Sequence, residues 1–262
     1  MPASTEAPTT RLPRRAAARA AACSGQARRK ATELGPLLGA CGLAGGAGAT
    51  TLAYLVALAA ARQLSGPVLV ADTGGPSGGL AALAGVEAPR SLPELASHLT
   101  TGLPLTHGIY ATGPSGLRVL ASAPEFSSSS PTAQLTRILD DAREAHRLTV
   151  IDCGTLGRDV DRTAAAAATH LAWVLSATEH GLEHGERLLH AAPRMAGSEL
   201  LVARRDVRQA KAPIKQLRRL AAERRATLVL LPHVNALEHR SADRALDEAQ
   251  VAIQAIVGAT LR

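Results

Sequence analysis

The feature that most constrains the fold is a long uncharged run, Gly35 to Ala61, with a cluster of glycines near its middle. The run is long enough to span a bilayer, so a membrane-spanning helix is one interpretation. Against it, the sequence GLAGGAGATTL at 42–52 favours a turn, because glycine allows unusual backbone conformations and contributes little to membrane transfer. We therefore predict a strand, a loop and a buried helix here, with no transmembrane span.

The rest of the chain alternates between apolar strand-like segments and helical patterns. Strands are predicted at 36–41, 68–73, 117–122, 148–154, 170–177, 199–205 and 227–232. Helices are predicted at 50–63, 79–84, 91–99, 132–146, 162–169, 179–192, 213–224 and from about residue 243. Because the strands are apolar runs that do not alternate with polar residues, both of their faces should be covered, as in a parallel sheet. The predicted fold class is α/β, with a mostly parallel sheet and helices on both faces.

Charge and composition divide the chain into a tail and a body. Residues 1–35 carry seven basic side chains against Glu6 and Glu33, in a sequence rich in Ala, Arg, Ser and Pro. This composition predicts a basic flexible tail. The remaining residues, 36–262, suit a single domain, since a chain of 262 residues with 46% hydrophobic content can bury one sizeable core.

Cysteine usage and the N-terminal sequence bear on localisation. The three cysteines form no C-x-x-C pair, which argues against a disulfide scaffold and a zinc ribbon. Arg14 and Arg15 give the outline of a twin-arginine or lipoprotein signal that ends near Cys23, but Arg19 interrupts the weakly apolar segment after them. We expect a cytoplasmic protein, with recruitment to a pole, septum or membrane apparatus left open.

A second basic segment, 204–225, holds nine basic side chains against Asp206 and Glu223. Such a patch attracts nucleic acid, anionic lipid or an acidic partner, and it is also typical of a solvated helix face. The candidate contacts for non-specific DNA are Arg204, Arg205, Arg208, Lys211, Lys215, Arg218 and Arg219.

The glycine-rich stretch lies between the first predicted strand and the first predicted helix. Backbone N–H groups and the positive end of the helix meet there, which makes it a phosphate-binding position. Gly45, Gly46 and Gly48 let the backbone wrap closely around an anion, and the Thr50 hydroxyl would face Mg²⁺. The alternative is a tight turn with no ligand.

Two aspartates end apolar strands further along the chain. Asp72 closes VLVAD, and Asp152 closes LTVID in the manner of a Walker-B acid that holds a magnesium ion's water shell. A buried carboxylate needs a partner, which a metal or loop N–H groups would supply. The alternative is that both aspartates cap adjacent helices.

These motifs together resemble the ParA/MinD superfamily of deviant Walker-A P-loop ATPases, especially its CpaE/TadZ-like and septum-site-determining branches. The family loop K-G-G-x-G-K-[ST]-T falls on residues 44–51, and D-x-D-P-x-G-G-G-L falls on 72–80. The resemblance implies a P-loop NTPase-like domain that binds ATP or ADP with Mg²⁺, forms a homodimer and acts with a protein partner. The implied metal ligands are Thr50 and Asp152, and Asp72 is the catalytic candidate. The implied nucleotide-binding residues are Gly45, Gly46, Ala47, Gly48, Ala49, Thr50 and Thr51.

Three departures from the family pattern bear on ATP hydrolysis. Both loop lysines are replaced by alanine, at Ala44 and Ala49, and the second aspartate of D-x-D is Gly74. Phosphoryl transfer depends on positive charge placed around the γ-phosphate, so hydrolysis at an ordinary rate is not expected. Backbone N–H groups, Thr50 and Mg²⁺ could still bind a nucleotide.

Two further segments carry patterns that known functional sites share. HGLEH at 180–184 matches H-x-x-E-H, in which two histidines bind zinc and Glu183 acts as base, although Gly181 and Gly185 weaken the helix and no third ligand is evident. We interpret it as polar surface. The last helix, from Asp243, has an acidic polar face, which suits packing on the sheet better than binding anionic lipid.

Three hypotheses for the function follow. The first is a nucleotide-binding positioning or regulatory protein of a secretion, pilus or septation/partition apparatus, with weak or absent ATP hydrolysis. The second is a nucleotide-independent, DNA-associated scaffold that uses the basic segment 204–225 and the tail. The third is a partner-stimulated ATPase.

Overall fold

The computed structural model describes residues 34–73, 79–86, 90–91, 110–121, 132–205, 213–234 and 241–262. Residues Gly35–Arg262 form one compact unit. The proposed basic tail, 1–35, lies outside the described residues except for its last two positions.

The described strands form one nine-stranded sheet. They are β1 (Leu37–Gly42), β2 (Val68–Asp72), β3 (Arg90–Ser91), β4 (Ala111–Thr112), β5 (Arg118–Ala121), β6 (Leu148–Asp152), β7 (His170–Ser176), β8 (Ser198–Arg204) and β9 (Thr227–Leu231). Their order is β3-β5-β2-β6-β1-β7-β8-β9, and β4 pairs with β5. Every pairing is parallel except that of β4 with β5, which confirms the mostly parallel sheet.

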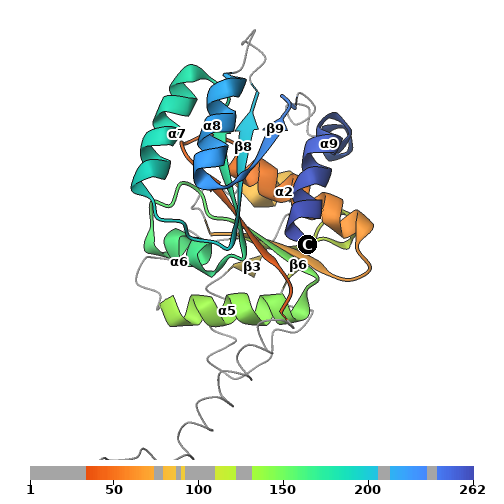
Figure 1. Ribbon diagram of the computed structural model, residues 1–262. Helices are drawn as coiled ribbons and strands as arrows, with labels where there is room; N and C mark the ends of the chain where they lie inside the picture. The colour runs from red at the N-terminus through yellow and green to blue at the C-terminus, as the bar shows by residue number, and fades with distance from the viewer. Residues whose placement is uncertain are drawn as a thin grey trace, which may run out of the picture. The chain divides into compact units, whose positions relative to one another are not determined.

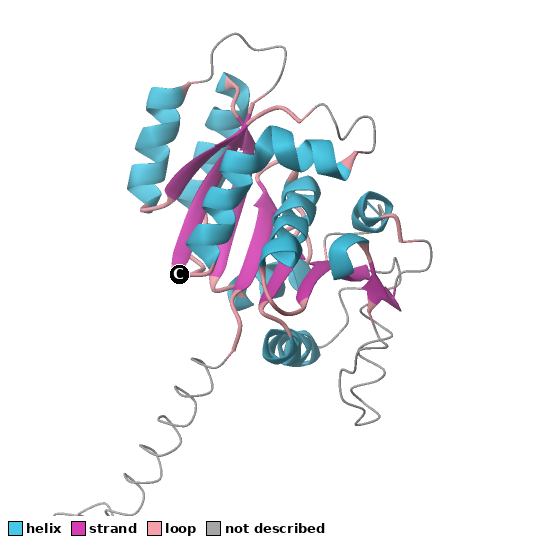
Figure 2. Cartoon of the chain, turned by 90° about the vertical axis from the view of Figure 1, so that its right-hand side faces the viewer, coloured by secondary structure: helices cyan, strands magenta, loops and turns pink. Residues whose placement is uncertain are grey.

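Helices cover both faces of this sheet (Figures 1 and 2). One face packs against α2 (Ala49–Gln63), α3 (Gly79–Ala84) and α9 (Ala242–Thr260). The other packs against α5 (Thr132–Ala145), α6 (Asp159–Ala167), α7 (Glu179–Ala191) and α8 (Ile214–Arg224). A short 3₁₀ helix, η1 (Pro114–Gly116), precedes β5. The predicted α/β class is therefore confirmed.

Burial on both faces explains the continuous apolar strands. All residues of β1, β2 and β6 are buried. Within β1, Leu38 and Ala40 join the core under α2 and α9, while Leu37 and Cys41 join the core under α5 to α8. Successive side chains of a strand point to opposite faces, so each strand contributes to both cores.

The uncharged run folds as a strand, a loop and a buried helix, as predicted. Residues 52–60 of α2 are all buried, between the sheet and α9. Helix α9 buries Leu246, Ile253 and Ile256 in the same core, which confirms that its apolar face packs against the domain. Among the described helices, none combines the length and the apolar content needed to cross a bilayer.

Differences from the predicted elements are confined to short or marginal segments. Strands β3 and β4, of two residues each, were not predicted, because so short a segment carries no hydrophobic periodicity. The helix predicted at 91–99 lies outside the described residues except for Ser91, which belongs to β3. Helix α6 begins at Asp159 instead of residue 162.

Candidate nucleotide-binding site

The candidate site lies at the carboxyl edge of the sheet. The parallel strands β1, β2, β6, β7 and β8 all end there. Strand β1 lies between β6 and β7. The chain leaves β1 for α2 on one face of the sheet and leaves the neighbouring β7 for α7 on the other face. In open α/β sheets, ligands bind at such a switch point.

Neighbouring strands anchor the start of the glycine-rich loop that joins β1 to α2. The Gly42 amide donates to the Gly154 carbonyl at 2.7 Å, and the Leu43 amide donates to the Val174 carbonyl at 2.8 Å. The following residues, 44–46, are exposed. The first residues of the loop are therefore fixed to the end of the sheet, and the following residues extend into solvent.

The backbone of the loop has the form that an anion site requires. Gly46 and Gly48 have φ values of 73° and 102°, which favour glycine. A Cβ atom added at Gly45 or Gly46 would meet no atom of the described residues within 4 Å, so none of their side chains fills the space beside these glycines. The amides of Gly45, Gly46 and Gly48 donate to no acceptor among the described residues. These N–H groups, with the first turn of α2, remain available for an anion.

Thr50 and Asp152, the predicted metal ligands, lie in direct contact. The Thr50 hydroxyl donates to Oδ2 of Asp152 at 2.5 Å, and the Gly154 amide donates to Oδ1 at 3.0 Å. Asp152 is only 2% exposed. Burial raises the pKa of this carboxyl group, the hydrogen bonds from Thr50 and Gly154 lower it, and the negative charge of Asp161 raises it further.

This pair suits a magnesium ion that is bound through a nucleotide. Mg²⁺ commonly takes one or two protein oxygen ligands and completes its shell with water and phosphate oxygens. No group of three or more His, Cys, Asp or Glu side chains that could hold a metal occurs in the part of the chain that the structure describes. A site that relies on Thr50, Asp152 and a phosphate needs no such group.

Asp72, the catalytic candidate, lies beside Asp152. The two are paired in register at the ends of β2 and β6, and Asp72 is 3% exposed. Thr73 links these strand ends, because its amide and hydroxyl both donate to the Asp152 carbonyl, at 3.0 and 2.8 Å. The structure thus brings the three predicted strand-end features together, while Gly74 lies outside the described residues.

A cavity of about 290 Å³ opens beside the loop. This volume is close to the lower limit of about 300 Å³ for small-molecule pockets. Its walls come from the loop, the end of β7, the start of α7 and the end of β8. The lining residues are Leu43, Ala44, Gly45, Gly46, Ala47, Leu175, Ser176, Thr178, His180, Gly181, His184 and Arg204.

The HGLEH segment is thus part of the wall of this cavity. His180 and His184 are one turn apart on α7 and both line it, whereas Glu183 is exposed and does not. The i, i+4 spacing correctly indicated a shared helix face. The described residues supply no third ligand, so the arrangement gives no support to a zinc protease.

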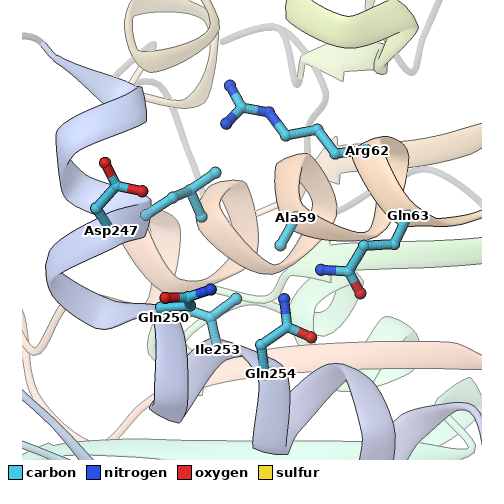
Figure 3. A pocket seen from close by; sticks show the side chains of 8 residues that line it. Ala59, Arg62, Gln63, Asp247, Gln250, Ile253 and Gln254 are labelled. Atoms are coloured by element: carbon cyan, nitrogen blue, oxygen red, sulfur yellow. The ribbon is translucent and has the colours of Figure 1, made fainter.

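A second cavity lies far from the loop. It measures about 150 Å³ and lies between the last turn of α2 and helix α9, with Arg62, Gln63, Gln250 and Gln254 in its wall (Figure 3). Helix α2 has 15 residues, so about 20 Å separates this cavity from the loop. Arg62 is already paired with Asp243, and none of the predicted site residues lines this cavity.

The basic segment 204–225 divides among several environments. Arg204 lines the loop cavity, Arg205 follows it, and Lys215, Arg218 and Arg219 lie on α8. Arg208 and Lys211 lie outside the described residues. On α8, Arg219 approaches Glu186 at 3.0 Å, which offsets part of the predicted positive patch.

The strand order, the open loop after β1 and the Thr50–Asp152 contact define an α/β fold of the P-loop NTPase type. The sequence matches no protein-family model and no curated protein. Solved structures of ParA and MinD ATPases nevertheless share this fold.

Three of these structures illustrate the likeness. A ParA family ATPase from Chlorobium tepidum TLS is 14% identical, with a TM-score of 0.71 over 88% of this chain and 99% of that chain. MinD from Pyrococcus horikoshii OT3, complexed with Mg-ADP, is 14% identical, with a TM-score of 0.64 over 87% and 94%. An ATP complex of a McdA variant from Cyanothece is 19% identical, with a TM-score of 0.64 over 87% and 96%.

Proposed function

We propose that this protein binds ATP or ADP with Mg²⁺ at the glycine-rich loop and acts as a ParA/MinD-like positioning or regulatory protein. The observation that carries this proposal is the open loop, whose amides at Gly45, Gly46 and Gly48 have no acceptor among the described residues. The Thr50–Asp152 pair stands at the first turn of the adjoining helix. Two proteins of the same fold are complexed with Mg-ADP and with ATP.

Thr50 provides the sharpest test of this proposal. Calorimetric titration of the full chain with Mg-ADP and Mg-ATP should show binding. Thr50→Ala should weaken it about tenfold or more, since removing groups that hold or orient a metal ligand commonly costs 10- to 100-fold. Thr50→Ser keeps the hydroxyl and should bind nearly as well as the wild type. A wild-type chain that binds neither nucleotide would refute the proposal.

The same site should hydrolyse ATP weakly or not at all. Residues 42–51 contain no cation, because alanine occupies both lysine positions of the related loop. Without charge placed at the γ-phosphate, the transition state loses much of its stabilisation. We expect steady-state phosphate release near background. Release that disappears on Asp152→Ala would instead establish the partner-stimulated ATPase hypothesis.

A switch of this kind acts through changes in association. We propose that nucleotide binding promotes a homodimer, which then docks on a protein of a secretion, pilus or septation/partition apparatus, as in the CpaE/TadZ-like branch that the sequence resembles. Light scattering with and without Mg-ATP measures the first step. A mass that is the same in both conditions, at saturating nucleotide, would contradict the dimer model.

A further inference from the structure

The glycine-rich loop contains no positively charged side chain to balance the negative charge of a bound phosphate. A nucleoside di- or triphosphate brings several negative charges to this position, while residues 42–51 supply only amides and hydroxyls. In the described structure, Arg204 at the carboxyl end of β8 reaches the loop. Its Nη1 and Cδ atoms lie 3.4 and 3.5 Å from the position that a Cβ atom on Gly48 would occupy.

The backbone of Arg204 is held in place, while its guanidinium group pairs with no group among the described residues. Its carbonyl accepts from the Ala177 amide at 2.8 Å, and Arg204 is in register with Ser176 and Leu231 on the two flanking strands. The side chain is half-buried and has no hydrogen bond or ion pair within the described part of the chain. An arginine side chain offers five N–H donors.

The surroundings of Arg204 favour an anion. The cavity that it lines also contains loop residues 43–47 and the start of helix α7, whose N-terminus is fixed by the Gly181 amide donating to the Thr178 hydroxyl at 2.8 Å. Helix α2 begins at the same loop. Two helix N-termini, each with a partial positive charge, thus lie at the cavity. His180 and His184 complete its wall without adding a carboxylate.

We propose that Arg204 supplies in this protein the positive charge that lysines supply in related loops, by donating hydrogen bonds to the phosphate oxygens of a bound nucleotide. The inference rests on the nucleotide binding proposed above and identifies the ligand class more closely. A site with one cation and a ring of amides should prefer a nucleoside di- or triphosphate over a monophosphate, because the terminal phosphates carry most of the charge. The cation comes from the same chain, on a strand of the sheet.

The test compares Arg204 variants with a matched control, in full-length protein titrated with Mg-ADP and with AMP. Arg204→Gln removes the charge and keeps most of the side-chain length. It should weaken Mg-ADP binding about tenfold to a hundredfold, as expected for a hydrogen bond to a charged group, and weaken AMP binding much less. Arg204→Lys should retain part of the affinity. Arg205→Gln, an exposed neighbour outside the cavity wall, should leave both affinities unchanged.

A variant that moves the positive charge to another position tests whether Arg204 acts through its charge or by holding the loop in shape. Adding Ala49→Lys to the Arg204→Gln chain places a cation at the lysine position of the related loops and should restore Mg-ADP affinity. If Arg204 only held the loop in shape, ADP and AMP would weaken equally and the added lysine would restore neither.

The two proposals fail in distinguishable ways. Wild-type protein that does not bind Mg-ADP overturns both of them. Mg-ADP binding that Thr50→Ala weakens and Arg204→Gln does not would overturn the role of Arg204 alone and leave the nucleotide site in place.

Discussion

An arginine side chain lies at each end of strand β8, and the two differ in how their charge is paired. Near its beginning, Arg224 of α8 forms two hydrogen bonds with the Glu199 carboxylate, at 3.0 and 3.1 Å, and that carboxylate is fully buried. The Leu189 and Ala192 carbonyls accept from the same guanidinium group at 2.9 and 2.8 Å. At the other end, Arg204 is half-buried beside the loop and has no such partner among the described residues.

This contrast separates an arginine that stabilises the fold from one that is available to a ligand. Arg224 also lies 6.0 Å from the centre of the Trp173 ring, so its charge is satisfied within the protein on several sides. A single basic segment of the sequence thus contains residues with different tasks. Counting charges along the chain could not distinguish them.

The largest expected effect is on stability. Arg224→Ala should lower the free energy of unfolding by about 3–5 kcal/mol, because it leaves the buried Glu199 carboxylate unpaired. Arg204→Ala should change it by no more than about 0.5 kcal/mol, since that side chain has no hydrogen bond or ion pair with any described residue. Urea unfolding followed by circular dichroism measures both values.

A paired replacement controls for lost packing. Glu199→Met combined with Arg224→Met removes the unpaired charge and should recover part of the stability that Arg224→Ala loses. Comparable losses for Arg204→Ala and Arg224→Ala would mean that the two ends of β8 do not differ as described.

A smaller effect concerns the DNA hypothesis, which the exposed cations of α8 keep open. Lys215 and Arg218 are exposed on α8, away from the cavity wall. If they contact duplex DNA, replacing both with alanine should reduce the slope of log affinity against log salt by roughly two, since each phosphate contact contributes about 0.9. Arg204→Ala should leave that slope unchanged.

The same variants should have the opposite effects on Mg-ADP binding. The Lys215→Ala, Arg218→Ala double variant should bind Mg-ADP as the wild type does, while Arg204→Gln should not. Fluorescence anisotropy with a random duplex, over a range of salt concentrations, provides the DNA measurement. A wild-type protein with no salt-dependent DNA binding would remove the scaffold hypothesis.

The sequence predicts the glycine-rich loop and the strand-end aspartates, because each of them follows from the residues directly beside it in the chain. A glycine cluster directly after an apolar strand indicates a loop at the edge of the sheet, and an aspartate that closes another apolar strand is placed at the same edge by parallel pairing. Thr50 and Asp152 therefore come together as the pattern implies, at 2.5 Å.

The remaining wall of the cavity depends on strand order, which no local pattern reveals. Arg204 reaches Gly48 because β7 lies between β1 and β8 and because Arg204 is paired with Ser176 at the end of β7. Within a segment of nine basic residues, nothing marks this one. His180 and His184 carry a visible signal, their spacing, but spacing shows which residues share a helix face and not what that face meets.

The smallest expected effect concerns Asp152 and depends on pH. Burial raises the pKa of this carboxyl group above its unfolded value, so the folded state favours the protonated form. The stability that Asp152 contributes is then fully present below the unfolded pKa and is lost as pH rises through the higher folded pKa. At neutral pH the ionised carboxylate should destabilise the ligand-free protein relative to a neutral side chain of the same shape.

Asp152→Asn should therefore raise the thermal unfolding midpoint at pH 7 without ligand, and the gain should shrink as pH falls toward the ordinary value for aspartate. The same variant should respond less to Mg-ADP, because it cannot offer a carboxylate to the metal's water shell. Differential scanning calorimetry at several pH values, with and without Mg-ADP, measures both effects. A midpoint that falls at pH 7 without ligand would show that the Thr50 and Gly154 hydrogen bonds outweigh the cost of burying the charge. Asp152 would then stabilise the fold, as Arg224 does, and would not be a group held ready for a ligand, as we propose for Arg204.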